Sequence, residues 1–371
     1  MTSTGSDSDP ARTPPPAGDT QPPRRRLPGP DVVRGVALIG VVVMNYHGYL
    51  ILEGGSRGDG VIARFFDPWR GPLSTRFAAT FVLVAGVGVT LMTRNARGDR
   101  VTSMRWRLAR RGVVLYAVGV LLDTEWPGTI IPYYGVMFVL ATFLFTLRTR
   151  WLVTIGVAAA IAGWLLRAWR HDRVTGGDDV RWLFAPEPGS LDDYVFGIFV
   201  NGTHPLVPWL AFFCAGMVLG RLLRVDWWRP ATFGVGVPLF APALVIESTA
   251  ETAFQTVLLS SDSLDRGVVH IASALGTALV AYSCLDWLAE RAPRLTDPLR
   301  RTGQMTLTLY LLHVVVFIVL VREFGLIDPT GLDVALTFAV AFWIAAILGA
   351  VWWSKRFGMG PAEQLYRSFG G

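Results

Sequence analysis

The stretch Asp31-Val-Val-Arg-Gly-Val-Ala-Leu-Ile-Gly-Val-Val-Val-Met-Asn-Tyr-His-Gly48 decides the fold class. An apolar run separates the charged residues Asp31 and Arg34 from the polar residues Asn45 and His47. At ~1.5 Å of rise per helical residue, the segment from Asp31 to His47 is roughly 24 Å long, most of the thickness of a bilayer's hydrocarbon core. Ionisable groups are expensive inside a membrane and are therefore candidates for a functional site. The stretch predicts a membrane-spanning helix with a charge near one face and an imidazole near the other.

The composition extends this interpretation to the whole chain. Its 371 residues are 52% hydrophobic and 17% charged, which is too apolar for an ordinary soluble protein. Backbone polar groups in lipid must be satisfied within their own segment, so each long apolar run is expected to be a helix. The sequence predicts an all-α, polytopic membrane bundle of about ten transmembrane helices, over residues 32–52, 75–93, 108–123, 131–147, 152–169, 205–222, 231–248, 267–288, 303–321 and 333–353.

The arginines predict the topology of the bundle. Loop 94–107 with the flanking Arg110 and Arg111 holds seven arginines, and the following alternate loops and the C-terminal end are also basic. The opposite loops carry mostly Asp and Glu, so both ends of the chain are expected in the cytoplasm, with multiple spans across the cytoplasmic membrane. The exception is loop 53–74, whose three arginines on the outer side favour an anionic ligand. Because the positive charge is distributed over alternate loops rather than gathered in one patch, it indicates membrane topology and does not predict nucleic-acid binding.

The chain divides into one membrane domain and two tails. Residues 1–30 are rich in Pro, Ser, Thr and Asp and predict a disordered cytoplasmic tail. The transmembrane domain is expected over residues 31–355, and residues 356–371 form a second cytoplasmic tail. Cys214 and Cys284 both lie in apolar runs, so they are interpreted as small packing residues rather than a disulfide or a zinc site.

Short motifs that occur in order along the chain resemble a known superfamily. The motifs similar to the heparan-α-glucosaminide N-acetyltransferase family are Asp31-x-x-Arg34-Gly35-x-Ala37-Leu38-Ile39, Asn45-Tyr46-x-Gly48, Trp69-x-Gly71 and Gly86-Val-Gly88. Those that resemble the related YeiB-like bacterial membrane proteins are Pro205-Leu-Val-Pro208-Trp209, Gly216-Met-x-x-Gly220-Arg221, Gly303-Gln-Met-Thr-Leu-Thr-Leu-Tyr310 and Gly360-Pro361-Ala-Glu363. Tyr310-Leu-Leu-His313 is similar to the Tyr-Leu-x-His of broader membrane acyltransferase families.

The resemblance implies a transmembrane acyltransferase domain. It implies acyl-CoA, with acetyl-CoA expected, as a donor from the cytoplasmic side, and a glycan or lipid-linked acceptor on the outer face. Two positions depart from the pattern. Phe66 stands where the acetyltransferases carry a histidine three residues before the tryptophan, and Arg76 stands where they carry an aspartate. Because of these departures, the family's catalytic residues cannot simply be transferred to this chain.

His47, Asn45 and Asp67 are the predicted catalytic residues. A near-neutral imidazole such as His47 can remove a proton from an amine or hydroxyl as that group attacks a thioester. Asn45 can donate to the developing oxyanion, and Asp67 can orient His47 as a carboxylate partner. The alternatives are that His47 only anchors the end of its helix and that Asp67 belongs to a solvated loop ion pair.

Arg34, His313 and Arg76 are the predicted cofactor-binding residues. Arg34 is expected to contact the phosphates of acyl-CoA, although an ion pair with Asp31 one turn earlier is an equal alternative. His313 lies about 15 Å into its span, near the middle of the membrane. It is interpreted either as part of a cofactor or proton path or as an interhelical hydrogen-bonding residue.

The other histidines do not form a metal-binding pattern. His204 and His270 are expected on the same side as His47, but no carboxylate-rich signature accompanies them, so no metal is predicted. The preferred function is an integral membrane acyltransferase that moves an acetyl group from cytosolic acyl-CoA to an acceptor in the cell envelope. A proton-coupled transporter or lipid flippase is the main alternative, and a non-catalytic membrane partner is another. Membrane lipid is the expected surrounding partner, and the sequence leaves open whether the chain forms a homo-oligomer.

Overall fold

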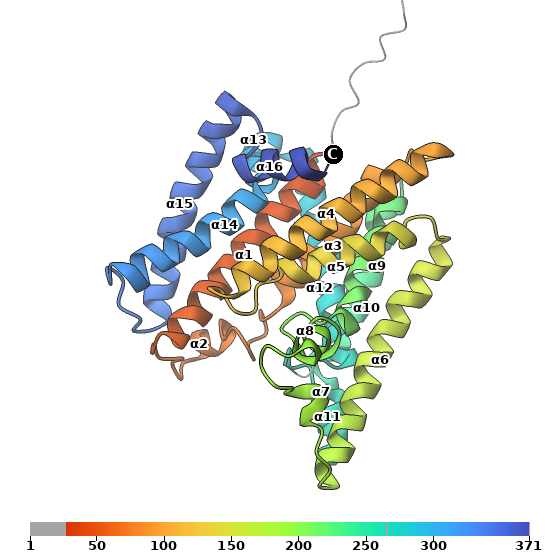
Figure 1. The fold of residues 1–371 in the computed structure, drawn as a ribbon, viewed down its shortest axis with the longest axis vertical. Coiled ribbons are helices and arrows are strands. Elements are labelled where there is room, and N and C mark those ends of the chain that lie inside the picture. The colour runs from red at the N-terminus through yellow and green to blue at the C-terminus, as the bar shows by residue number, and fades with distance from the viewer. Residues whose placement is uncertain (1–26, 265, 371) are drawn as a thin grey trace, which may run out of the picture.

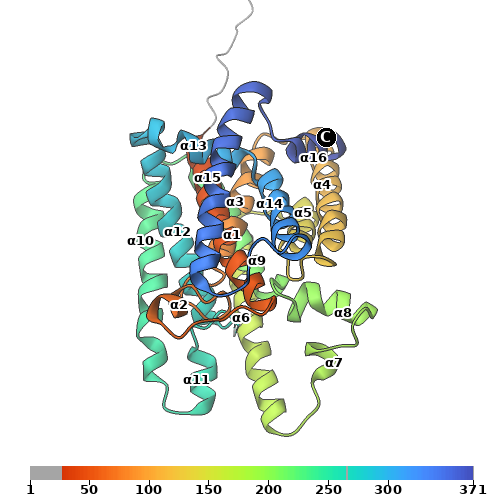
Figure 2. The same ribbon diagram turned by 90° about the vertical axis from the view of Figure 1, so that its left-hand side faces the viewer.

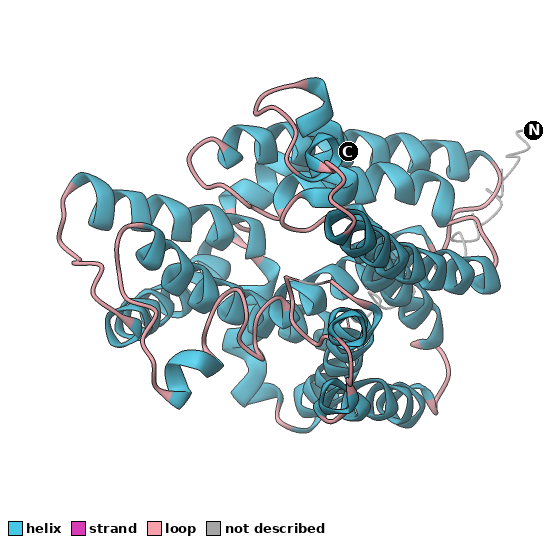
Figure 3. Ribbon diagram, turned by 90° about the horizontal axis from the view of Figure 1, so that it is seen from below, coloured by secondary structure: helices cyan, strands magenta, loops and turns pink. Residues whose placement is uncertain are grey.

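The computed structural model describes residues 27–264 and 266–370, and every regular element in these ranges is helical (Figure 3). Long helices run side by side between two ends of the molecule (Figure 1, Figure 2). They are α1 (Pro28–Leu52), α3 (Arg76–Thr93), α4 (Asp99–Asp123), α5 (Ile131–Leu144), α6 (Thr149–Thr175), α9 (Leu206–Leu222), α10 (Trp228–Phe240), α12 (Val268–Arg291), α14 (Thr306–Phe317) and α15 (Leu332–Phe357). The predicted all-α class is confirmed.

Shorter helices lie mainly at the two ends of this bundle. One end, where α1 begins and α3 ends, carries most of the loop arginines and is called the arginine-rich end; the opposite one is called the far end. The arginine-rich end holds α13 (Pro293–Gln304) and α16 (Pro361–Gly370). At the far end are α2 (Val61–Phe65), α7 (Arg181–Phe184), α8 (Leu191–Phe196), η1 (Gly197–Asn201), η2 (Ala241–Leu244), η3 (Ile246–Thr249), α11 (Ala253–Leu259) and η4 (Ile318–Glu323).

Several of the helices have the length and composition of membrane spans. Among the described residues six helices meet both conditions, namely α1, α3, α6, α12, α14 together with η4, and α15. A seventh span results if α8 and η1 are joined to α9 across a bend of 50°. All ten predicted ranges overlap helices, but α4 is rich in arginine and α5 and α10 are short. The protein is therefore a helical membrane protein, and the total of ten spans stays a prediction.

Helix α1 lies at the centre of the bundle (Figure 1) and packs against α3, α12, α13, α14 and α15. Its small residues allow this close packing. A side chain at Gly35 would overlap the Leu299 carbonyl of α13, and one at Gly40 would overlap the Phe77 ring of α3. Small residues at helix contacts let backbones approach closely in membrane proteins. The central position means that both polar ends of the quoted stretch are surrounded by protein.

Helix α16 folds back onto the arginine-rich end and packs against α4 and α14. The Glu363 carboxylate accepts hydrogen bonds from the backbone N–H groups of Leu307 at 2.6 Å and Thr308 at 3.2 Å. It thus satisfies free N–H groups in the first turn of α14, where a negative charge is also favourable. The predicted tail 356–371 therefore includes an ordered helix that is fastened to the membrane domain.

The N-terminal boundary also differs slightly from the expected one. Helix α1 begins at Pro28 and so includes the last three residues of the expected tail, of which Gly29 and Pro30 are buried. Proline is well tolerated in the first turn of a helix because its missing N–H has no partner there. Residues 1–26 of the predicted disordered tail lie outside the described residues.

Candidate functional site

A large cavity of ≈ 1230 Å³ opens at the arginine-rich end, between α1, α3, α4, α5, α14 and α16. Three exposed arginines belong to its outer part and three half-buried ones lie further inside. Of the described residues, Asp31 and Glu363 are the two carboxylates that line the cavity. The Glu363 carboxylate already accepts a hydrogen bond from the backbone N–H of Leu307 at the start of α14. The lining therefore favours an anionic ligand. The six arginines are Arg94, Arg224 and Arg367 in the outer part, and Arg34, Arg107 and Arg111 further inside.

The deeper part of the cavity is mostly apolar and contains two tyrosines. Its lining includes Ile130, Phe138, Tyr134 and Tyr310. The Tyr134 hydroxyl is buried, and none of the described side chains or backbone groups is hydrogen-bonded to it. A buried polar atom without a partner is costly and indicates a place where a ligand or water completes the site. The cavity thus combines a cationic mouth with an apolar interior that ends in hydrogen-bonding groups.

Arg34 lines this cavity, and its predicted contact with the phosphates of acyl-CoA stays a prediction. Its Nη1 is 3.7 Å from Asp31 Oδ1, and its side chain remains 25% exposed. The guanidinium reaches across to α3, where a Cβ on Gly88 would lie 3.3 Å from Nη2. The absence of a side chain at Gly88 therefore makes room for Arg34. Asp31 also accepts a hydrogen bond from Gln304 Nε2 at 3.0 Å, so Arg34 is not its sole partner.

A buried polar cluster lies directly beyond the cavity, where α1 meets α14. Asn45 Nδ2 is 3.2 Å from His313 Nε2, and the Asn45 side chain is also hydrogen-bonded to the Tyr310 hydroxyl. Thr129 Oγ1 is 2.9 Å from the same hydroxyl. Because Tyr310 also lines the cavity, hydrogen bonds connect the cavity wall to the imidazole of His313.

The hydrogen bonds assign the tautomer of His313. Its Nδ1 contacts the backbone carbonyl of Tyr310, which can only accept, so Nδ1 carries the proton. Nε2 then has the lone pair and accepts from the Asn45 amide. The ring is fully buried, and Trp126 and Phe317 lie close to one another beside it. His313 is therefore a neutral, oriented imidazole with its basic nitrogen directed at α1.

His47 is buried at a different place, near the far end of α1. Its Nδ1 donates to the Phe66 carbonyl at 2.8 Å, and Nε2 has no hydrogen-bond partner in the described chain. No hydrogen bond joins Asp67 to His47 in the described chain, and Asp67 Oδ1 accepts from the backbone N–H groups of Trp69 and Arg70, each at 2.8 Å. The structure thus joins Asn45 to His313 rather than to His47. The catalytic roles of His47 and Asp67 stay predictions.

Arg76 is at the far end of α3, away from the arginine-lined cavity. It donates to Pro72 O and Thr277 Oγ1, both at 2.6 Å, and to Ser273 Oγ at 3.2 Å. Its guanidinium therefore connects α3 to α12, and it is not brought together with Arg34. These contacts do not test the prediction that Arg76 binds a cofactor, which stays a prediction.

The remaining histidines are also separate from the cavity. His270 Nε2 is 2.9 Å from Thr75 Oγ1, and the His204 ring lies against Trp209 and Tyr133. Within the described ranges, no group of three or more His, Cys, Asp or Glu side chains is placed to hold a metal ion.

Sequence reasoning did not single out several residues of the cavity and the cluster. The sequence indicated Tyr310 only as the first residue of the Tyr-Leu-x-His motif, one helical turn before His313. The aromatic side chain of Trp126 and the hydroxyl of Thr129 come from the loop between α4 and α5, for which no signal was present. The arginines were recognised as a topology signal, but not as the lining of one cavity.

Comparisons with known proteins identify the family of the chain. Residues 26–246 match the family model described as heparan-alpha-glucosaminide N-acetyltransferase, catalytic, and residues 217–370 match a family described as a protein of unknown function (DUF418). The chain is also 23% identical over 385 residues to the uncharacterized protein YeiB of Escherichia coli (strain K12), covering 91% of this chain and 94% of that protein. The cavity takes residues from both matched regions, Arg34 and Tyr134 from the first and Tyr310 from the second. The chain therefore belongs to the heparan-α-glucosaminide N-acetyltransferase catalytic family and is similar to YeiB over 91% of its length.

Proposed function

We propose that this protein is a membrane acyltransferase that transfers the acetyl group of acetyl-CoA to an amine or hydroxyl acceptor. The observation that carries the proposal is the arginine-lined cavity whose deep wall is hydrogen-bonded, through Tyr310 and Asn45, to His313. The family supports an acetyltransferase-like activity in general. The donor, the acceptor and the assignment of residues to steps are our proposal.

The cavity suits the two parts of the donor. The diphosphate and the 3′-phosphate of coenzyme A are anionic, and arginine is the preferred side chain for such groups because its planar guanidinium donates two parallel hydrogen bonds. The apolar interior suits the neutral pantetheine arm. From Arg34 to Asn45 the rise along α1 is roughly 16 Å, so the two ends of the site are separated by about half a membrane.

The polar cluster supplies the groups that acyl transfer requires. An amine or hydroxyl attacks the thioester carbonyl carbon, its proton passes to Nε2 of His313, the carbon–sulfur bond breaks, and the proton leaves on the sulfur as the free thiol of coenzyme A. When Nε2 takes the proton, it can no longer accept from Asn45. The Asn45 amide is then released to donate to the oxyanion. One hydrogen bond of the resting state thus couples the base to the oxyanion donor.

We further propose that the arginine-rich end faces the cytoplasm, since basic loops are retained on that side, and that the protein lies in the cytoplasmic membrane. Acetyl-CoA would then come from the cytosol. The acceptor, a glycan or lipid-linked sugar of the envelope, would approach from the far end, where His47 is placed.

One experiment tests the proposal and separates the two histidines. The purified protein in lipid nanodiscs is incubated with acetyl-labelled acetyl-CoA and an envelope glycan and lipid fraction, and both acceptor label and free thiol are measured. We expect His313→Gln to lower the rate by about 10²–10⁴-fold and Asn45→Ala by about 10²–10³-fold, the usual contributions of a general base and an oxyanion donor. Thermal unfolding checks that each variant is folded.

The outcomes have distinct meanings. Loss of transfer in His47→Gln with retention in His313→Gln would move the base to His47. Thiol release that no variant changes would contradict a role for the cluster. Solute movement into proteoliposomes without consumption of thioester would favour the transporter or flippase alternative.

A further inference from the structure

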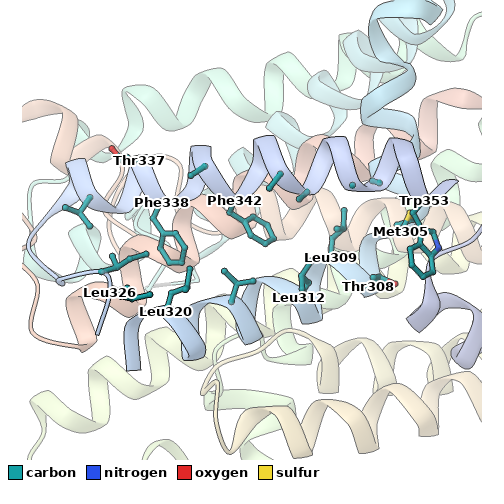
Figure 4. Close-up of a pocket in the computed structure, with 18 of the residues that line it drawn as sticks. Met305, Thr308, Leu309, Leu312, Leu320, Leu326, Thr337, Phe338, Phe342 and Trp353 are labelled. Atoms are coloured by element: carbon teal, nitrogen blue, oxygen red, sulfur yellow. The ribbon is translucent and has the colours of Figure 1, made fainter. Parts of the chain in front are cut away.

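A second large space lies between α14 with η4 and α15, on the side of the bundle away from the arginine-lined cavity (Figure 4). We call this space, of ≈ 1020 Å³, the α14–α15 groove. Helices α14 and α15 each pack on α1, but they are not closely packed against each other. Apolar side chains from both helices enter the space between them: Leu309, Leu312 and Leu320 from the α14 side, and Phe338, Phe342 and Trp353 from α15.

One wall of the groove is formed by residues with little or no side chain. Ala341, Ala345 and Gly349 follow one another at intervals of one helical turn on α15, and all three are exposed. A Cβ on Gly349 would meet nothing within 4 Å. The space is therefore open along the helix rather than filled by the protein's own side chains.

The groove lies along two candidate membrane spans, so its surroundings are hydrocarbon. Its central lining has no charged group that water would solvate, and an apolar space of this kind is filled by apolar matter. Its volume is at the upper end of the usual range for ligand pockets, about 300–1,000 Å³. A flexible hydrocarbon chain can lie lengthwise between the side chains that the two helices direct into this space.

The charged groups of the groove are confined to its far end. Asp328 and Asp333 line that end and are exposed, and neither forms a salt bridge within residues 27–264 and 266–370. In the part of the chain that the structure describes, no lysine or arginine lines the groove. Two carboxylates without a basic residue favour a positively charged headgroup and disfavour a purely anionic one.

We infer that the α14–α15 groove binds the hydrocarbon chain of a membrane lipid whose amine-bearing headgroup lies beside Asp328 and Asp333. The site is separate from the proposed donor cavity, because α14 presents Leu307 and Tyr310 to the cavity and Leu309 and Leu312 to the groove. The inference does not depend on the acyltransferase proposal.

The groove nevertheless shares a wall with the polar cluster. Phe338 is stacked on Tyr46 with ring centroids 4.1 Å apart, and Phe342 meets the same ring edge-on at 5.7 Å. Tyr46 in turn donates a hydrogen bond to the backbone carbonyl of His313 at 3.1 Å. A chain in the groove therefore contacts the two α15 rings that pack on Tyr46, and Tyr46 in turn connects α1 to α14.

The test compares lipid retention between groove variants and a neighbouring control. The full chain is purified, stripped of lipid by detergent exchange, and mixed with phosphatidylethanolamine or phosphatidylglycerol of identical chains, and bound lipid is counted by native mass spectrometry. We expect the unmodified protein to retain more phosphatidylethanolamine than phosphatidylglycerol. Ala345→Trp, which fills the groove, should lose most of this bound lipid, and Ile344→Trp, on the adjacent exposed face outside the groove, should keep it.

A second pair of variants tests the headgroup. Asp328→Asn combined with Asp333→Asn should abolish the preference for phosphatidylethanolamine while the total number of bound lipids stays the same. Gly349→Phe provides an independent way to fill the groove if Ala345→Trp does not fold, as judged by thermal unfolding and gel filtration.

Three results would overturn the inference. The first is equal retention of lipid by the unmodified protein and both groove-filling variants. The second is a preference of the unmodified protein for phosphatidylglycerol. The third is a dimer without bound lipid that Ala345→Trp dissociates, which would make a second copy of the chain the occupant.

Discussion

Replacement of Arg34 by glutamine is expected to weaken the binding of acetyl-CoA about tenfold. Arg34 lies in the half-buried part of the arginine-lined cavity, and its Nη1 is 3.7 Å from Asp31 Oδ1, too far for a direct hydrogen bond. A hydrogen bond to a charged group contributes about 1.5–3 kcal/mol, and each 1.4 kcal/mol corresponds to a factor of ten in Kd, which gives about 10- to 150-fold. Neighbouring arginines partly compensate, so the lower figure is expected.

The binding assay has a matched control and a graded variant. Acetyl-CoA binding is measured by titration calorimetry in nanodiscs at two salt concentrations, and the unmodified protein should lose more affinity with added salt than Arg34→Gln does. Arg110→Gln removes an exposed arginine of α4 that does not line the cavity, and it should leave Kd unchanged. Gly88→Val keeps the charge but displaces the guanidinium, because a Cβ there lies 3.3 Å from Nη2, so its effect should be intermediate.

The reasoning about the cavity is refuted by either of two results. Binding of acetyl-CoA to Arg34→Gln with an unchanged Kd would mean that the phosphates do not contact this part of the cavity. An equal loss in Arg110→Gln would mean that the arginines act only through the overall charge of this end of the protein.

Two further variants test other parts of the structure. Glu363→Ala should lower the free energy of unfolding by about 1 kcal/mol, a typical value for the loss of a helix cap, because Leu307 N and Thr308 N then lose the carboxylate that accepts their hydrogen bonds. Limited proteolysis should then cleave α16 faster, whereas cleavage at the unchanged rate would contradict the capping role. Burial lowers the pKa of Arg266 to about 10, so the unfolded chain binds its proton more tightly and stability should rise with pH between about 10 and the ordinary value of 12.5. Arg266→Met should accordingly raise the Tm at neutral pH and flatten that pH dependence, and a lower Tm would show that the buried charge is well paired.

The helices could be predicted from the sequence because each long apolar run must form a helix in a membrane. The stretch that begins at Asp31 shows this well, since helix α1 covers it completely. The loop arginines likewise predicted which loops share one side of the membrane, and this topology stays a prediction. The pattern of apolar runs and charged loops could not predict which helices lie next to each other in the bundle.

The pairing of Asn45 with His313 is the clearest case. Asn45 is two residues from His47 but 268 residues from His313 in the chain, and hydrophobic periodicity says which face of a helix is apolar, not which helix it meets. Lipid tails are as apolar as leucine, so packing and hydrogen bonds between particular side chains select the neighbours of a membrane helix. The hydrogen bonds from Trp69 N and Arg70 N to the Asp67 side chain could not be predicted from the sequence either, because they depend on the local path of the chain after α2.

The cap formed by Glu363 connects the rim of the arginine-lined cavity to the first turn of α14. Helix α16 supplies Tyr366 and Arg367 to the rim of the cavity, and the same helix holds the first turn of α14 through Glu363. Any outward swing of α16 that widens the entrance must break those hydrogen bonds and loosen the helix on which Tyr310 and His313 are carried. Under the proposed function, admission of the donor and alignment of the buried imidazole would therefore be mechanically linked, and hydrogen exchange at Leu307 and Thr308 should report both at once.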